Sequence, residues 1–196
     1  IIFADDLGAA DVGGYGSQYL KTPHIDKLAA HGTKFMQGYA HTVCCPSRAS
    51  LFTGRYPQRA GVAVWCMNYP GDPNSGHPVP GLPPEEITLA ECLKQGGYRT
   101  GLFGKWHLGG KKEYWPNDQG FDDFFGHLSG GIDAYEHTYI KGNNPPHDLY
   151  RNREKVREEG KYLPDLVVRE TKRFRRENKD VRFFACASFD LVHTPL

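Results

Sequence analysis

The chain has 196 residues, 39% of them hydrophobic, and a formal net charge of +1 at pH 7. That length allows one good-sized α/β domain with its own core. Without a long block of like charges, nucleic acid and anionic membrane surfaces are not indicated as partners, and every apolar run is far too short to span a bilayer.

The ends of the chain and its cysteines indicate less about the class of protein. The sequence starts at Ile1 inside an apolar run, without an initiator Met, and stops at Leu196, so we expect a piece of a longer protein. No signal segment is visible, which carries no weight when the true N-terminus is missing. The cysteines are too few and too scattered for a disulfide scaffold, and no Cys-x-x-Cys suggests zinc. We expect core positions for Cys92, on a helix, and Cys186, on a strand.

Residues 1–4 predict a short buried strand that ends in Asp5 and Asp6. In open α/β sheets, sites are built at the carboxyl ends of strands. Adjacent carboxylates repel each other unless a cation lies between them, and hard oxygen ligands favour Ca²⁺ or Mg²⁺. A solvated Asp-Asp turn is the alternative interpretation of this pair.

Thr22 and Pro23 predict the start of a helix, as capping residue and first-turn proline, with Gly32 at its end. Its apolar face consists of Ile25, Leu28 and Ala29. Residues 34–41 then favour a strand that leads toward Cys44.

Residues 44–55, with the sequence CCPSRASLFTGR, join a nucleophile, a helix start and a fixed cation. With Pro46 at the first helical position, Cys44 lies just ahead of a helix N-terminus. The partial positive charge there predicts a lowered pKa for the Cys44 thiol, and the Arg48 guanidinium fits a tetrahedral oxyanion. A buried cysteine pair before an ordinary helix is the alternative.

Residues 56–86 are rich in Pro and Gly and predict a long loop, in which Trp65 and Tyr69 either face a substrate or pack against the scaffold. Thr88 then predicts the cap of a helix that ends at residues 96–97. The next strand, over residues 99–103, leads to Lys105.

Lys105 and His107 are two residues apart and can point the same way from extended chain. The polar, aromatic-rich residues 110–162 follow without a predicted regular element. There Asp133, Tyr135 and His137 either line a substrate subsite or only form turns.

The last predicted elements are a helix from Leu163, with an apolar stripe, and a strand over residues 182–189. Basic residues toward the C-terminal end of the helix suit its dipole and predict a solvated face, with an anionic polymer as the less favoured contact. His193 follows the strand. We therefore predict an α/β fold with a mainly parallel central sheet flanked by helices, in which four strands lead to the polar residues.

Three of these segments together resemble the type I sulfatases, a branch of the alkaline phosphatase superfamily. The segments are Cys-x-Pro-Ser-Arg with Leu-x-Thr-Gly-Arg at 44–55, Gly-Lys-Trp-His-Leu-Gly at 104–109, and Ser-Phe-Asp-x-x-His-x-Pro at 188–195. The pattern of residues 5–35 is also similar, with His24 where the family more often has Asn. The resemblance implies residues 1–196 to be the N-terminal part of one catalytic domain, in an extracytoplasmic (periplasmic, secreted or lysosomal) protein.

The same resemblance implies the chemistry. A formylglycine-generating enzyme would oxidise Cys44 to formylglycine, whose hydrate attacks the sulfur of a sulfated small molecule or polysaccharide. It assigns Lys105 and His107 to the sulfate and the formylglycine hydroxyl, and adds Arg48 and His193 to the site. Asp5, Asp6 and residue 44 would hold Ca²⁺, or Mg²⁺, with further ligands expected beyond residue 196, so that the piece alone is expected to be inactive.

Two other functions stay open. Relatives with the same signature handle phosphorus esters, so a phosphonate or phosphodiester hydrolase is one, and a non-catalytic anion-binding fragment is the other. A cysteine phosphatase is disfavoured because its chemistry needs five residues between Cys and Arg, where this chain has three.

Overall fold

The computed structural model describes residues 1–66, 79–140 and 143–194. The chain divides into two compact units, a larger one of residues 1–5 and 41–196 and a smaller one of residues 6–40. None of the helices in the described part of the chain is both long and apolar enough to cross a membrane.

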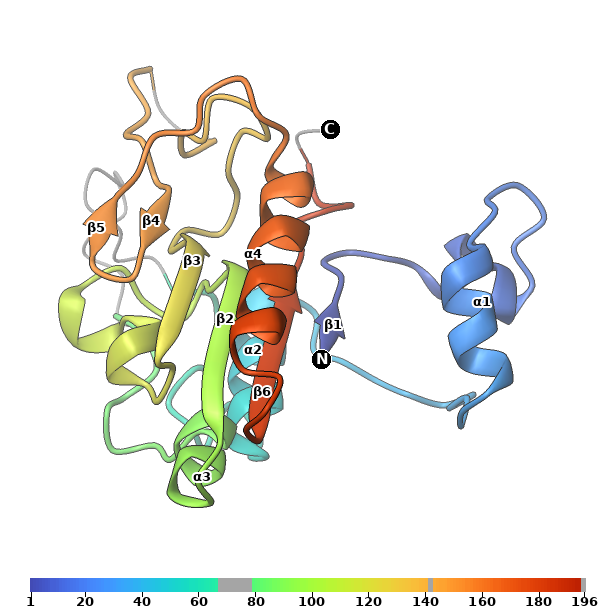
Figure 1. The fold of residues 1–196 in the computed structure, drawn as a ribbon, viewed down its shortest axis with the longest axis horizontal. Coiled ribbons are helices and arrows are strands. Elements are labelled where there is room, and N and C mark those ends of the chain that lie inside the picture. Colours follow the sequence, from blue (N-terminus) through green and yellow to red (C-terminus); the bar gives the residue numbers. More distant parts are fainter. Residues whose placement is uncertain (67–78, 141–142, 195–196) are drawn as a thin grey trace. The chain divides into compact units, whose positions relative to one another are not determined.

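The larger unit is built on a six-stranded sheet in the order β1-β6-β2-β3-β4-β5 (Figure 1). The first four of these strands are parallel, and the two short strands at the β5 edge are antiparallel. The predicted α/β fold with a mainly parallel sheet is therefore confirmed. The strands are β1 (Ile2–Phe3), β2 (Arg99–Lys105), β3 (Asp123–His127), β4 (Tyr150–Arg151), β5 (Glu154–Lys155) and β6 (Phe183–Ser188).

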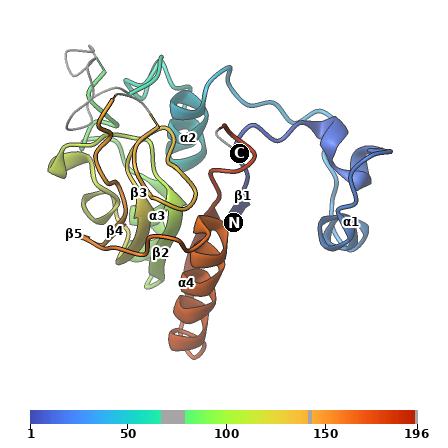
Figure 2. The same ribbon diagram turned by 90° about the horizontal axis from the view of Figure 1, so that it is seen from above.

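Helices cover both faces of this sheet (Figure 2). Successive strand residues point to opposite faces, so Leu102 packs into one core and Phe103 into the other. The first core includes residues of α2 (Cys44–Thr53) and α3 (Leu89–Gln95). The second packs against the stripe of α4 (Leu163–Glu177), which buries Leu166, Val167 and Phe174 as predicted.

Helix α2 begins at Cys44, two residues before the predicted start. Val43 is the extended N-cap residue, and Pro46 is the third helical residue. A proline fits there because the first-turn N–H groups of a helix have no intrahelical acceptor. The early start places Cys44 on the helix itself.

Helix α3 has its predicted cap, because Thr88 and Glu91 form a reciprocal capping box. Cys92 is exposed on this helix, so the core position predicted for it is wrong, whereas Cys186 on β6 is buried as expected. The prediction failed at Cys92 because α3 packs only part of its circumference against the first core.

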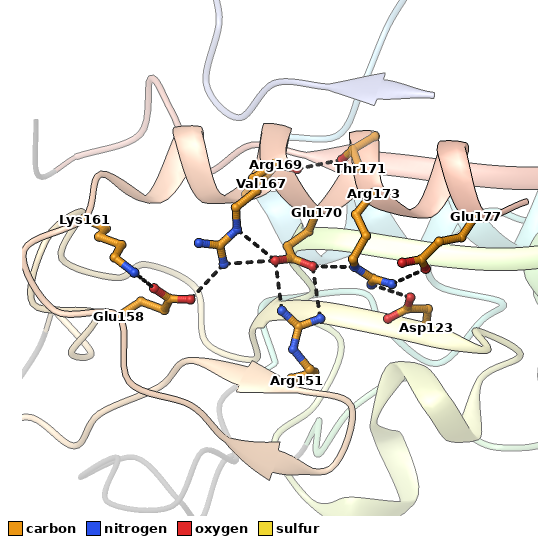
Figure 3. Close-up of polar contacts among 10 residues, drawn as sticks. All are labelled: Asp123, Arg151, Glu158, Lys161, Val167, Arg169, Glu170, Thr171, Arg173 and Glu177. Carbon is orange, nitrogen blue, oxygen red and sulfur yellow. Dashed lines mark hydrogen bonds and ion pairs between the residues drawn. The ribbon is translucent and has the colours of Figure 1, made fainter.

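Residues 110–162 contain β3, β4 and β5, which the sequence did not reveal. An ion-pair network anchors this region to α4 (Figure 3). Its centre is Glu170, buried and paired with Arg151, Arg169 and Arg173. Arg173 also pairs with Asp123 of β3 and Glu177, so this part of the predicted solvated basic face is a structural contact instead.

The smaller unit contains two 3₁₀ turns and helix α1 (Pro23–Ala30). Thr22 precedes α1 as predicted, but its hydroxyl accepts from the Gly13 N–H and donates to Asp26 instead of capping the helix. The apolar face predicted for α1 is not buried, since Leu28 is 67% exposed. The strand predicted over residues 34–41 is wrong: this segment is irregular and pairs with no strand of the described chain.

Candidate active site

The predicted site residues of the larger unit gather at the carboxyl edge of the parallel strands. Lys105 ends β2 directly beside His127, the last residue of β3. Ser188 ends β6 next to β1, whose continuation carries Asp5. Parallel strands bring their carboxyl ends to one edge, which is why these distant segments meet. The predicted site residues of this unit come from three strand ends, of β1, β2 and β6, and from helix α2, where four strands were predicted.

Five buried residues form what we call the buried charge cluster: Asp5, Arg48, Lys105, His127 and Asp190. The Lys105 ammonium pairs with Asp5 Oδ2 and lies 3.0 Å from Asp190 Oδ1. Arg48 Nη2 is 3.5 Å from the same Asp5 oxygen, and His127 Nε2 is 3.8 Å from Asp190 Oδ1. Two cations therefore face two carboxylates in a region with little solvent exposure.

The Arg48 side chain connects the ends of several strands. It is fully buried, and its Nη1 donates at 2.7 Å both to the Lys105 carbonyl and to Ser188 Oγ. Its guanidinium also lies over the Phe3 ring, 4.9 Å from the centroid. One side chain of α2 thus contacts the ends of β1, β2 and β6.

Cys44 lies next to His107, with 3.1 Å between Cys44 Sγ and His107 Nδ1. The pKa of the Cys44 thiol is raised to about 11, because of its hydrogen bond with Cys45 and its burial, which outweigh His107 and Lys105. The predicted lowering of this pKa is therefore wrong. At neutral pH the unmodified side chain is a thiol, which is a poor nucleophile compared with a thiolate.

His107 is held in a constrained position. Its φ is +55°, a left-handed conformation that is uncommon for residues other than glycine. A Cβ on Gly130 would lie 2.5 Å from His107 Cε1, so the imidazole packs directly on the Gly130 backbone. Burial lowers the pKa of His107 to about 4, which keeps its ring neutral near pH 7.

His193 follows β6 in a turn closed by its N–H to the Asp190 carbonyl. Its Nδ1 is 2.6 Å from the Thr194 carbonyl oxygen. The Gly130–Gly131 segment reaches both histidines, since a Cβ on Gly131 would lie 3.6 Å from His193 Cε1. His107 and His193 therefore border the same glycine segment.

Asp148 fixes the loop that carries these glycines. It is fully buried and accepts hydrogen bonds from the N–H groups of Leu128 and Ser129. The Ser129 hydroxyl donates to the Gly131 carbonyl. Hydrogen bonds to Asp148 and within the loop thus hold the glycine segment in place beside the site.

Sequence reasoning missed Asp190 and His127 as members of the site. Asp190 lay within the segment quoted for His193 and came directly after a predicted strand, which was the available signal. His127 ends a strand that the sequence did not reveal. Burial lowers the pKa of His127 well below its usual value, and burial raises that of Asp190.

The residues considered for a substrate subsite divide by their contacts. Asp133 Oδ1 accepts from two turn N–H groups, and His137 is buried against the Lys161 carbonyl, so both stabilise loops. Tyr135 is about half exposed and stacks on Tyr162 at 5.2 Å between centroids. Trp65 is also about half exposed, and Tyr69 lies outside the described residues.

A divalent metal fits these residues only in part. Asp5 offers the hard oxygen ligand that Ca²⁺ or Mg²⁺ prefers, and its buried Oδ2 accepts no hydrogen bond of good geometry. Within the described residues no group of three or more His, Cys, Asp or Glu side chains could hold a metal ion. Asp6, the other predicted ligand, belongs to the smaller unit and is exposed.

A thiol and an imidazole beside a buried charge cluster, at the carboxyl edge of a mainly parallel sheet, define an α/β site of the kind that enzymes build at strand ends. The sulfatase family model matches residues 1–196, and the chain belongs to the sulfatase family. Mouse arylsulfatase J is 36% identical over 202 residues, covering 100% of this chain and 32% of the relative. The chain thus spans about a third of that relative's length.

Solved structures of sulfatase relatives share the fold. The Ps i-CgsB structure in complex with k-i-k-neocarrahexaose has a TM-score of 0.87 and 34% identity, over 99% of this chain and 45% of that one. A structure of BT4656 in complex with its substrate D-glucosamine-2-N,6-O-disulfate has a TM-score of 0.76 and 25% identity, over 98% and 34% of the two chains.

Proposed function

We propose that the protein to which this chain belongs is an enzyme that hydrolyses sulfate monoesters, with residue 44 as its nucleophile. Residues 1–196 would be the N-terminal part of its single catalytic domain. The observation that carries the proposal is the 3.1 Å contact between Cys44 and His107, formed beside the buried Lys105 at the edge of the sheet. Family membership supports the reaction type.

The proposed substrate is a sulfated carbohydrate or an aryl sulfate. A disulfated glucosamine is the printed substrate of one structural relative, and a neocarrahexaose is bound in another. Family resemblance places such an enzyme outside the cytoplasm, in a periplasmic, secreted or lysosomal location.

Residue 44 would act as formylglycine, made from Cys44 by a formylglycine-generating enzyme. The raised pKa of the thiol supports this form, because an unmodified Cys44 is protonated at neutral pH. When present, formylglycine supplies a hydrated aldehyde with one hydroxyl to attack sulfur and a second to expel sulfate.

His107 is the proposed general base at residue 44. Its Nδ1 faces the side chain of that residue, and its low pKa keeps the ring neutral, so that one ring nitrogen is unprotonated at neutral pH. The packing on Gly130 holds the ring in place, so the proton acceptor is fixed before substrate binds.

His193 is the proposed acid for the leaving oxygen. Since Nδ1 lies against the Thr194 carbonyl, the proton would come from Nε2. Lys105 would bind the sulfate group, and Arg48 would keep Lys105 and the strand ends in position through its contacts with the Lys105 carbonyl and Ser188.

Asp5 and Asp6, with residue 44, are the proposed ligands of a divalent metal, Ca²⁺ or Mg²⁺. When bound, such an ion would polarise the nucleophile and one sulfate oxygen. The chemistry of the Asp5 carboxylate supports this assignment.

The test is to coexpress the full-length protein with a formylglycine-generating enzyme and to analyse the tryptic peptide of residues 35–48. This peptide holds both Cys44 and Cys45, so tandem mass spectrometry must locate the change. We expect an aldehyde at residue 44, an intact thiol at Cys45, and hydrolysis of aryl sulfate esters.

A Cys44→Ala protein should lose this activity, and Cys92→Ala, which changes an exposed cysteine on α3, should keep it. An unmodified Cys44 together with no turnover would favour a non-catalytic anion-binding protein. Faster turnover of phosphate diesters or phosphonates than of sulfate esters would favour the phosphorus-ester hydrolase.

A further inference from the structure

The buried charge cluster is balanced. Arg48 and Lys105 carry two positive charges, and Asp5 and Asp190 carry two negative charges when ionised. His127 faces Asp190 as well, but its burial lowers its pKa well below its usual value, so its ring adds no charge at neutral pH. The sulfate-binding Lys105 is thus largely compensated by its own neighbours.

Sulfate and phosphate monoesters have nearly the same tetrahedral shape but differ in charge. A sulfate monoester carries one negative charge, whereas a phosphate monoester loses its second proton near pH 6 and carries close to two at pH 7 and above. Carboxylates that neutralise the cations of a site also repel the bound anion. Each further negative charge on the anion increases this repulsion, so such a site favours the anion with less charge.

We infer that Asp190 is a specificity-determining residue, whose carboxylate beside Lys105 favours monoanionic sulfate esters over dianionic phosphate esters. The inference rests on the proposed function, in which Lys105 binds the anion. Asp190 suits this role because it is 8% exposed, lies 3.0 Å from Lys105 Nζ, and is not one of the proposed metal ligands. We expect its charge to act on the anion through space, from its position beside Lys105.

Neutralising Asp190 would remove one negative charge from the site and so make its net charge more positive by one unit. With an effective dielectric constant of about 20, one unit charge several ångströms from the ligand changes relative affinity for a dianion over a monoanion by at least about tenfold. A bound metal would be common to wild type and variant, so it would cancel from the comparison.

The experiment compares wild type, Asp190→Asn and Asp190→Glu in the full-length, formylglycine-containing protein. The kcat/KM values for 4-nitrophenyl sulfate and 4-nitrophenyl phosphate are measured on the same preparation, so that their ratio does not depend on the folded fraction. Asp190→Ser is a second neutral variant in case Asp190→Asn does not fold. Glu170→Gln is the control, since it also removes a buried, arginine-paired carboxylate, on α4.

We expect the phosphate-to-sulfate ratio of kcat/KM to rise at least about tenfold in Asp190→Asn, and to stay near the wild-type value in Asp190→Glu and Glu170→Gln. An unchanged ratio in the neutral variants, or an equal rise in Glu170→Gln, would overturn the inference.

Calorimetric Kd values for inorganic sulfate and inorganic phosphate separate this inference from the proposed function. If wild type hydrolyses neither ester, the proposed function fails. The Kd ratios then show whether Asp190 determines the preference for sulfate over phosphate. A relative gain of phosphate binding in the neutral variants would support its role, and an unchanged Kd ratio would refute it.

Discussion

The Gly130 backbone limits where the His107 imidazole can lie. His107 Nδ1 lies 3.1 Å from the Cys44 sulfur, and His107 combines a left-handed backbone with a ring that packs on Gly130. Strained residues of this kind are tolerated where the surrounding structure fixes them, and they concentrate at functional sites. The Asp148 carboxylate provides that support by binding the backbone just before the glycines.

Gly130→Ala should therefore disturb the site more than the fold. The new Cβ would lie 2.5 Å from His107 Cε1 and 2.6 Å from Nε2, so the ring must move. A displacement of about 1 Å from a productive geometry can cost about 100-fold in rate. We expect kcat/KM for an aryl sulfate to fall at least about tenfold, measured by steady-state kinetics.

Gly38→Ala is the matched control for this variant. Among the described residues, its added Cβ would meet only Phe35 Cβ, at 4.0 Å, so activity should not change. A Gly130→Ala protein that folds and keeps the wild-type kcat/KM would show that the His107 position does not limit the reaction.

Helix α4 is fixed to the sheet by apolar packing and by the Glu170 network shown in Figure 3. Burial would raise the pKa of Glu170, but hydrogen bonds from Arg151 and Arg173 lower it to about 2. Arg151 of β4 pairs with Glu170 of α4, and Arg173 of α4 pairs with both Glu170 and Asp123 of β3, so the network connects β4, β3 and α4. The network lies on the same face of the sheet as the second core.

Glu170→Gln should destabilise the fold, because it leaves three arginines around a neutral amide. Breaking a buried ion pair on one side typically costs about 3 kcal/mol or more. The measurement is the free energy of unfolding from denaturant titration at pH 7. Arg157→Gln, which removes a surface pair with Glu159, should change it by about 0.5 kcal/mol at most.

The pH dependence of this effect has a definite sign. The pKa of Glu170 is lower in the folded state, about 2, than its usual 4.5. Its contribution to stability is complete above 4.5 and is lost as the pH falls toward 2. The difference between wild type and Glu170→Gln should therefore shrink over this range, and a difference that grows there would contradict the assignment.

At the scale of the whole molecule, the predicted metal ligands Asp5 and Asp6 are consecutive residues that fall in the larger and the smaller unit. Divalent metal that binds only the folded protein stabilises it by mass action. We expect added Ca²⁺ to raise the Tm of the full-length wild-type protein by several degrees, and excess chelator to reverse the rise, as measured by calorimetry.

The variant for this test is Asp6→Asn, which should reduce the Ca²⁺-dependent rise in Tm. Asp180→Asn, at an exposed position near the end of α4, is the control and should respond like wild type. An equal response in all three proteins would exclude Asp6 as a ligand.

The sequence alone predicted the fold class, because hydrophobic periodicity and capping are local signals. The buried strand at 182–189, the Thr88 cap and the apolar stripe of α4 all have such signals, and the structure confirms them. Local signals failed where tertiary contacts decide. Residues 34–41 have strand-like composition but pair with no strand among the described residues, and β3 to β5 form in a polar region, where β3 pairs with β2 and β4 with β3.

The site shows the same division. The types and order of Cys44, Arg48, Lys105, His107 and His193 were readable from the sequence because they lie in compact motifs. Only the tertiary structure brought Asp190 and His127 to Lys105, since the residues come from three different strand ends. It also reversed the predicted pKa shift of Cys44, because burial and the Cys45 hydrogen bond outweigh the effect expected from a helix N-terminus, and neither can be seen without the packed structure.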